Sequence, residues 1–222
     1  MSRTLLDRDR TLEAILERKL VAVVRSERAD RLVGVLEALA EGGVDVAEVT
    51  FTVPNALEVI QEARRRLGDR IKLGAGTVLD PETARAALLA GASFVVAPTL
   101  NLEVIRLCRR HGAVVMPGAF TPTEILTAWE AGADVVKLFP ADVGGPAYLK
   151  AIRAPLPQVK LMPTGGVDLT TARAFLDAGA CCLGVGSALV DPKAIASGNT
   201  DRLRELARQF RAVVDESPMV GN

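Results

Sequence analysis

The sequence predicts an α/β protein, a (β/α)8 TIM barrel with an extra N-terminal helix. The first observation behind this prediction is a repeating unit of an amphipathic helix, a glycine and a short apolar run. The second is that the apolar runs are nearly continuous rather than alternating, as expected of parallel strands buried on both faces. A chain of 222 residues suits one such barrel, so a single domain spanning 1–222 is expected.

The apolar runs place the strands, and five of them follow a glycine that ends a helix. Glycine readily adopts the left-handed conformation that closes a helix, and it stands at this position at Gly43, Gly91, Gly112, Gly132 and Gly179. Eight strands are predicted in chain order, at Val21–Val24, Val46–Thr50, Lys72–Ala75, Phe94–Ala97, Val114–Met116, Val135–Leu138, Lys160–Met162 and Cys182–Val185.

A helix is expected after each strand, and the extra helix is expected around Leu5–Lys19. Apolar residues at helical spacing indicate one buried face, as at Leu32, Val35, Leu36 and Leu39. Two helix starts carry a capping side chain followed by proline, at Asp80–Pro81 and Thr121–Pro122. A doubly wound open sheet is the alternative, but no Rossmann-type glycine fingerprint follows the first strand.

Composition argues against several classes of function. Basic and acidic residues balance at 27 each, so no electrostatic footprint for nucleic acid or an anionic membrane is expected. Neither an export signal nor a bilayer-spanning apolar stretch is evident. Three cysteines, with Cys181 and Cys182 adjacent, make a poor disulfide framework, so a cytoplasmic setting is expected. Since His111 is the one histidine, a metal site built on several histidines cannot form, and neither metal nor cofactor is expected.

Lys137 lies within the predicted sixth strand, inside an apolar run. Burying an ammonium costs several kcal/mol unless it is paired, and desolvation favours the neutral amine of a lysine. A neutral amine is the form that attacks a carbonyl to make a Schiff base. Lys137 is therefore a candidate nucleophile, and the alternative is a core lysine held by a salt bridge.

Two more charged residues stand where a barrel places its active site, toward the carboxyl ends of the strands. Glu48 lies inside the second predicted strand, and across the barrel mouth from Lys137 it can act as a counter-ion, a proton shuttle or both. Arg25 follows the first strand. Its guanidinium can clamp a substrate carboxylate in bidentate fashion, or it can simply rim the barrel.

Glycines after the last two predicted strands indicate a phosphate site. Gly165 and Gly166 follow the seventh strand, while Gly184 and Gly186 flank the end of the eighth. Such glycines let backbone N–H groups approach an anion, and barrels commonly bind phosphate in these two loops. Ser187 can add a hydroxyl and cap a following helix. The alternative is that these glycines only make tight turns.

Seven motifs occur in order along almost the whole predicted barrel: EGGVDVAEVTFTVPNA, GAGTVLDP, VVAPTLN, MPGAFTPTE, VVKLFPA, PTGGV and LGVGSALV. Together they closely resemble the class I 2-keto-3-deoxy-6-phosphogluconate (KDPG) aldolases, whose members often also act on 4-hydroxy-2-oxoglutarate (KHG). The resemblance implies that Lys137 is the Schiff-base lysine and Glu48 the general acid/base. It further implies pocket positions at Thr77, Pro98 and Phe139, and phosphate loops at Thr164, Gly165, Gly166, Gly186 and Ser187.

The resemblance also implies a reaction and an assembly. KDPG would be cleaved to pyruvate and glyceraldehyde 3-phosphate, and KHG to pyruvate and glyoxylate, by a homotrimer without metal or cofactor. Several members of the family carry an arginine after EVT, where this chain has Phe51-Thr52, so Arg25 becomes the candidate carboxylate anchor. Two other functions remain: a non-covalent phosphosugar isomerase, epimerase or decarboxylase, and a non-enzymatic phosphosugar-binding protein.

Overall fold

The computed structural model describes residues 2–216, in which helices alternate with strands. The strands are β1 Leu20–Val24, β2 Val46–Thr50, β3 Lys72–Gly76, β4 Phe94–Val96, β5 Val114–Met116, β6 Gly118–Ala119, β7 Val136–Leu138, β8 Leu161–Pro163 and β9 Leu183–Val185. The α-helices are α1 Ser2–Arg18, α2 Leu32–Glu41, α3 Ala56–Leu67, α4 Pro81–Leu89, α5 Leu102–Arg110, α6 Pro122–Glu130, α7 Gly145–Arg153, α8 Ala172–Asp177, α9 Pro192–Ser197 and α10 Thr200–Asp215. Short 3₁₀ helices are η1 Gly68–Arg70 and η2 Ala141–Val143.

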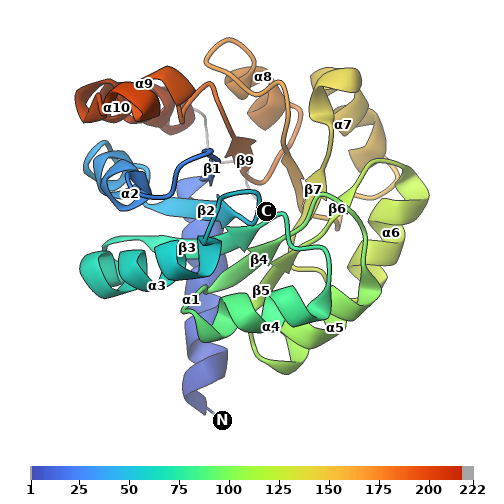
Figure 1. The fold of residues 1–222 in the computed structure, drawn as a ribbon. Coiled ribbons are helices and arrows are strands. Elements are labelled where there is room, and N and C mark those ends of the chain that lie inside the picture. Colours follow the sequence, from blue (N-terminus) through green and yellow to red (C-terminus); the bar gives the residue numbers. More distant parts are fainter. Residues whose placement is uncertain (1, 217–222) are drawn as a thin grey trace.

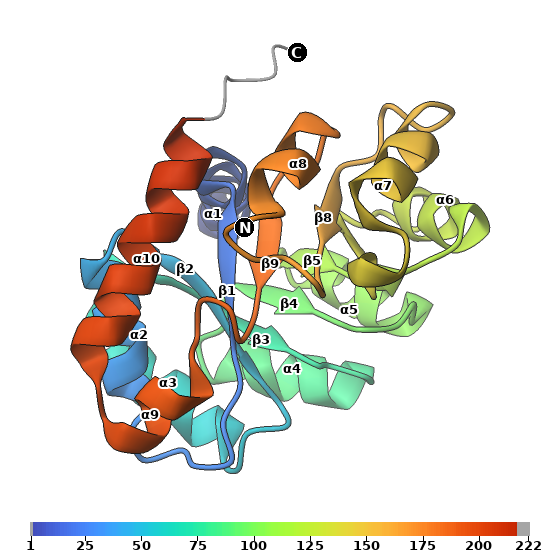
Figure 2. The same cartoon turned by 90° about the horizontal axis from the view of Figure 1, so that it is seen from above.

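The strands are parallel and form two sheets, in the orders β5-β4-β3-β2-β1-β9 and β6-β7-β8. Helices surround the strands in Figure 1, and α10 lies along α2 in both views (Figure 2). The predicted α/β class and N-terminal helix are therefore confirmed. Each of the eight predicted runs contains a strand, but β6 was not predicted. It is separated from β5 by Pro117, which has no N–H to donate to a ladder.

Helix ends follow the sequence signals. The five helix-ending glycines Gly43, Gly91, Gly112, Gly132 and Gly179 all have positive φ, between 64° and 106°, as predicted. Asp80 accepts a hydrogen bond from the Thr83 backbone N–H at the start of α4. Thr121 and Glu124 form the reciprocal capping box of α6, which fixes that helix start.

Strand residues alternate between a helix-facing core and an inner core. The inner core contains Phe94 and Val96 of β4, whereas Val95 belongs to the helix-facing core. Inner residues of both sheets join one cluster, whose members include Val21, Val46, Val114, Met116, Val135, Met162 and Cys182. The sheets are therefore curved around a common interior.

Helix α1 covers one end of this interior. Its Ile15 is fully buried in the inner core, with Leu12 and Leu16 packed against it. Arg8 of α1 pairs with Asp134, whose carboxylate also accepts a hydrogen bond from the Val115 backbone N–H at 2.9 Å. Among residues 2–216, no helix has the length and hydropathy needed to cross a membrane.

Candidate active site

Strand alternation places Lys137 and Glu48 on the inner face of the sheets. Val46 and Val135 belong to the inner core, so the side chains two residues further along each strand, Glu48 and Lys137, point the same way. Both are buried, with exposed fractions of 1% for Glu48 and 5% for Lys137. Two of the three charged residues singled out from the sequence, Lys137 and Glu48, therefore share the interior.

Glu48 carries a carboxylate with an unusual environment. Both carboxylate oxygens are buried and have no hydrogen-bond partner among the described residues. Burial raises the pKa of Glu48, and the positive charges of Lys137 and then Arg25 oppose that rise. The structure thus brings Lys137 and Arg25 within electrostatic reach of Glu48.

Glycine in β3 makes room for the Glu48 side chain. Glu48 pairs with Gly74 in the ladder, and Thr50 pairs with Gly76. A Cβ placed on Gly76 would lie 2.7 Å from Cδ of Glu48, which is closer than real Cβ contacts allow. Glycine at position 76 is therefore a spatial requirement of the glutamate on the second strand, whereas glycine at position 74 makes room for the Phe94 ring.

Lys137 has few partners. Its backbone N–H donates to Pro117 O at 2.9 Å, and its Nζ lies 5.0 Å from the centre of the Phe139 ring. No carboxylate among the described side chains forms an ion pair with it. A structural salt bridge, the alternative interpretation of this lysine, is therefore not found in the described part of the chain.

A cavity of about 990 Å³ opens at the carboxyl ends of β1, β8 and β9. Seven of the predicted site residues line it: Arg25, Phe139, Thr164, Gly165, Gly166, Gly186 and Ser187. Lys137 and Glu48 are not in its lining. They adjoin it through lining residues, because Phe139 faces the Lys137 amine and Val23 pairs with Glu48.

The two glycine-rich loops meet at the cavity wall. Gly165 and Gly166 have positive φ, 93° and 67°, which favours glycine at both positions. Thr164 bridges to Gly184, and a Cβ on Gly184 would lie 2.2 Å from Oγ1 of Thr164. That hydroxyl is buried with no partner among the described residues, so it is available to a ligand.

Ser187 differs from its predicted capping role. The Leu189 and Val190 backbone N–H groups both donate to Gly186 O, which makes a single turn rather than a helix. The next helix, α9, is capped by Asp191. Ser187 therefore stays exposed in the cavity wall as a hydroxyl and a turn N–H, without a helix behind it.

Thr77 and Pro98 lie outside the cavity lining. Thr77 follows Gly76 at the end of β3 with φ 57°, a rare and strained conformation for a β-branched residue. The Pro98 carbonyl packs against Gly118, and Gly118 pairs with Lys137 across β6 and β7. Thr77 therefore adjoins the glycine that packs against Glu48, and Pro98 packs against the glycine that pairs with Lys137.

Several cavity residues were not singled out from the sequence. The loop after β1 supplies Ser26, Arg28 and Arg31, and Thr52 and Asp168 come from the loops after β2 and β8. Arg28 pairs with Asp30, while Arg31 donates to the carbonyls of α9 residues Ile195 and Ala196. Arg25 is the lining arginine that forms no ion pair or hydrogen bond with the described residues. The density of arginine after the first strand is the signal that could have found this wall.

Known proteins resemble the chain over most of its length. The family model for KDPG and KHG aldolase matches residues 12–206. A Treponema pallidum 2-dehydro-3-deoxy-phosphogluconate aldolase is 37% identical over 91% of this chain and 96% of its own length. An Escherichia coli 2-dehydro-3-deoxy-6-phosphogalactonate aldolase is 36% identical over 77% and 83%.

A solved structure of a KDPG aldolase is also similar to this chain. The KDPG aldolase of Legionella pneumophila, with pyruvate captured as a covalent carbinolamine intermediate, superposes with a TM-score of 0.84. It is 29% identical, and the alignment covers 90% of this chain and 97% of that one. The sequence motifs, the family model and the relatives agree, and the chain belongs to the KDPG and KHG aldolase family.

Proposed function

We propose that the protein is a class I aldolase that cleaves KDPG to pyruvate and glyceraldehyde 3-phosphate through a Schiff base on Lys137. The observation that carries this proposal is the shared burial of an amine with no ion-pair partner among the described residues and the unpartnered Glu48 carboxylate. The names of the relatives support the substrate class. KHG, cleaved to pyruvate and glyoxylate, is proposed as a further substrate of the same site.

Schiff-base formation is the first half of the proposed reaction. The neutral Lys137 amine adds to the C2 ketone and gives a carbinolamine. Glu48, in its protonated form, donates a proton to the departing hydroxyl, which leaves as water and produces a protonated imine. The raised pKa of Glu48 supports this role, because the carboxyl can hold the proton that it donates.

Carbon–carbon cleavage is the second half. Glu48, now a carboxylate, takes the proton of the C4 hydroxyl directly or through water, and the C3–C4 bond breaks. Its electron pair moves into the imine, so glyceraldehyde 3-phosphate leaves and an enamine remains on Lys137. Protonation at C3 gives the pyruvate imine, and water hydrolyses it to pyruvate and the free amine.

The two ends of the substrate are proposed to bind different walls of the cavity. The phosphate would take the N–H groups of the loops at Gly165–Gly166 and Gly186–Ser187, together with the unpartnered Thr164 hydroxyl. Thr77, Pro98 and Phe139 would hold the pyruvyl portion near Lys137. Arg25 is proposed as the carboxylate anchor, because it is the cavity arginine with no described partner.

We also propose that the two sheets close into one eight-stranded barrel, in which β5 and β6 are two parts of one strand. The Thr164–Gly184 bridge supports closure between β8 and β9, as does the hydrogen bond from Cys181 N to Leu161 O at 2.9 Å. The single domain over 1–222 and the cytoplasmic setting stay predictions.

A homotrimer is proposed from the family resemblance. Large apolar side chains left exposed on the isolated chain support an interface between copies: Leu79 at 52%, Leu89 at 69%, Trp129 at 41% and Val143 at 71%. Light scattering coupled to size exclusion tests this proposal. A mass near that of one 23.5 kDa chain would contradict it.

The activity itself is tested by measuring pyruvate release from KDPG, its galactonate epimer and KHG with wild-type protein and Lys137→Ala. Wild-type protein should release pyruvate from KDPG, and Lys137→Ala should lose turnover with an unchanged circular dichroism spectrum. Lys160→Ala, which removes a lysine next to β8, is the matched control and should keep full activity. Substantial turnover by a folded Lys137→Ala protein would contradict the proposal.

A further inference from the structure

A second cavity, of about 790 Å³, lies at the opposite end of the strands from the candidate active site. Its walls come from Thr11 of α1 and from the chain that enters β3, β4 and β5, at Lys72, Ser93 and Ala113. Six basic side chains line it: Arg8, Arg10, Arg64, Lys72, Arg85 and His111. The acidic side chains of the lining are Asp7 and Asp69.

Part of this positive charge is not paired within the cavity lining. Arg8 pairs with Asp9 and Asp134, and Arg64 pairs with Asp69. Among the described side chains, none forms an ion pair or side-chain hydrogen bond with Arg10, Lys72, Arg85 or His111. The cavity therefore holds three formal cations and an imidazole that form no ion pair with these residues, against one unpaired carboxylate in the lining, Asp7.

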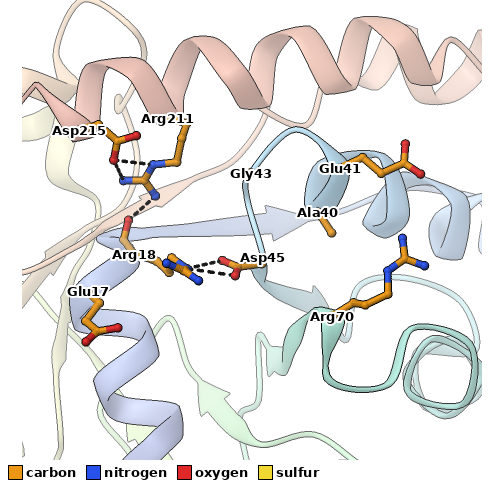
Figure 3. A pocket seen from close by; sticks show the side chains of 9 residues that line it. All are labelled: Glu17, Arg18, Ala40, Glu41, Gly43, Asp45, Arg70, Arg211 and Asp215. Atoms are coloured by element: carbon orange, nitrogen blue, oxygen red, sulfur yellow. Dashed lines mark hydrogen bonds and ion pairs between the residues drawn. The ribbon is translucent and has the colours of Figure 1, made fainter.

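A neighbouring crevice of about 530 Å³ shows the contrasting arrangement (Figure 3). There Arg18 binds Asp45 through both carboxylate oxygens, and Arg211 pairs with Asp215 and donates to Arg18 O. The remaining arginine, Arg70, pairs with Glu37 outside the view. Both crevices are rich in arginine. Among the described residues, only the larger crevice has arginines that form no ion pair. A high arginine content therefore does not by itself leave arginines unpaired.

The pKa of His111 reflects the positive charge around it. Burial lowers the pKa of His111, and the nearby positive charges of Arg85 and Arg110 lower it further. A protonated His111 would be repelled by these arginines, and a bound anion would relieve that repulsion. The free-energy gain from this relief favours an anionic ligand at this place.

We propose that this cavity is a second ligand site, which binds a small phosphate-bearing anion between α1 and the amino-terminal ends of β3, β4 and β5. Guanidinium and ammonium groups are the usual protein partners of phosphate, and guanidinium binds it in bidentate fashion. The cavity volume lies within the range of small-molecule sites, about 300–1,000 Å³. The balanced overall charge of the chain favours a compact ligand over nucleic acid. This proposal does not rest on the aldolase assignment.

The single histidine of the chain makes the site directly measurable. The imidazole proton signals of His111 are followed by NMR across pH, with inorganic phosphate or pyrophosphate added at constant ionic strength against chloride. The pKa of His111 should rise and saturate with the concentration of the phosphate anion. Ionic strength is held constant because screening alone also weakens repulsion between cations. Comparing the binding of phosphate with that of pyrophosphate shows whether the site prefers one phosphate group or two linked ones.

Three variants complete the experiment. Arg85→Gln and Lys72→Gln should each weaken phosphate binding at His111 by about tenfold, the usual scale for one lost charged hydrogen bond. Arg85→Gln should also raise the pKa of His111 without any phosphate, which checks that the variant is folded and that the two side chains face each other. Arg202→Gln, on α10 and paired with Glu205, is the matched control and should bind as wild type does.

The proposal is overturned by either of two results. One is an unchanged pKa of His111 at saturating phosphate. The other is an equal response in wild-type protein and in both cavity variants, because that would show general screening or an effect transmitted from elsewhere.

Discussion

At the scale of single residues, Glu48 is costly to bury. A carboxyl with two buried oxygens and no described hydrogen-bond partner loses hydration that no partner replaces. Its position opposes stability, and its raised pKa expresses that cost. Retaining such a group is expected where it handles a proton in the reaction.

Replacing Glu48 by glutamine should therefore separate activity from stability. Glu48→Gln keeps the shape of the side chain but cannot exchange a proton, so kcat for KDPG should fall by about 10²–10⁴-fold. The exposed residue Glu58 supplies the control, and Glu58→Gln should leave kcat unchanged. Steady-state assays of both variants decide the matter, and near-normal turnover by Glu48→Gln would remove Glu48 from the proton-transfer steps.

The same variant has a predicted pH signature in stability. Because the pKa of Glu48 is raised on folding, the native state binds more protons than the unfolded state between the unfolded pKa, about 4.3, and the folded one. The free energy of unfolding contributed by this group therefore falls as pH rises through that window. Urea unfolding from pH 4 to 8 should show that the free energy of unfolding of Glu48→Gln, relative to that of wild type, increases as pH rises. A constant difference would mean that Glu48 titrates normally.

Gly76 is predicted to tolerate substitution as poorly as Glu48, which lies beside it. Gly76→Ala would put a methyl group 2.7 Å from Glu48 Cδ, so it should destabilise the fold by about 1–3 kcal/mol and reduce kcat. Gly34→Ala in helix α2 is the control, because a Cβ at this position meets nothing within 4 Å. This substitution should stabilise the fold by about 1 kcal/mol, since alanine favours a helix over glycine. Thermal unfolding of both proteins checks the pair, and equal stability of Gly76→Ala and wild type would contradict the contact.

At the scale of elements, α1 closes the interior at the end opposite the candidate active site. Ile15 is fully buried there with inner residues of the strands. Ile15→Ala should cost about 2–5 kcal/mol in the free energy of unfolding, because a buried isoleucine leaves a cavity. Its kcat should stay near wild type, since the reacting groups lie further along the strands. Urea unfolding measures the first quantity, and exposed Glu13→Ala is the control.

Local signals predicted these elements well. The helix-ending glycines, the Thr121–Glu124 capping box and the apolar strand runs depend on residues close in sequence, so the sequence carries them. Strand β6 was missed because it has two residues and follows Pro117. Ser187 was misassigned as a helix cap, because a single turn and a helix start look alike over a few residues.

The candidate site was likewise predictable only where its signals are local in the sequence. Lys137 and Glu48 stand out because a charge inside an apolar run is rare, and the glycine pairs follow strand ends. The arginine-rich wall after β1 was not recognised, because its approach to the loops after β8 and β9 depends on how distant strands pack. The unpartnered cations at the other end depend on tertiary pairing and cannot be read from spacing.

At the scale of the whole molecule, the two ends of the strands carry different chemistry. The carboxyl ends lead to a cavity with glycine-rich loops beside buried Lys137 and Glu48, and the amino ends lead to a cationic cavity beneath α1. A rigid packed interior separates them, so ligands at one end need not compete with ligands at the other. The covalent chemistry is assigned to the first end alone.

The central claim is that Lys137 forms the Schiff base, and borohydride trapping tests it most directly. Wild-type protein is reduced in the presence of pyruvate, and the product is analysed by intact mass and peptide mapping, with Lys137→Ala as the control. We expect one reduced pyruvate adduct per chain, located on Lys137 and absent from the variant. An absence of adduct, or adducts spread over surface lysines, would contradict the covalent mechanism and favour a non-covalent phosphosugar barrel.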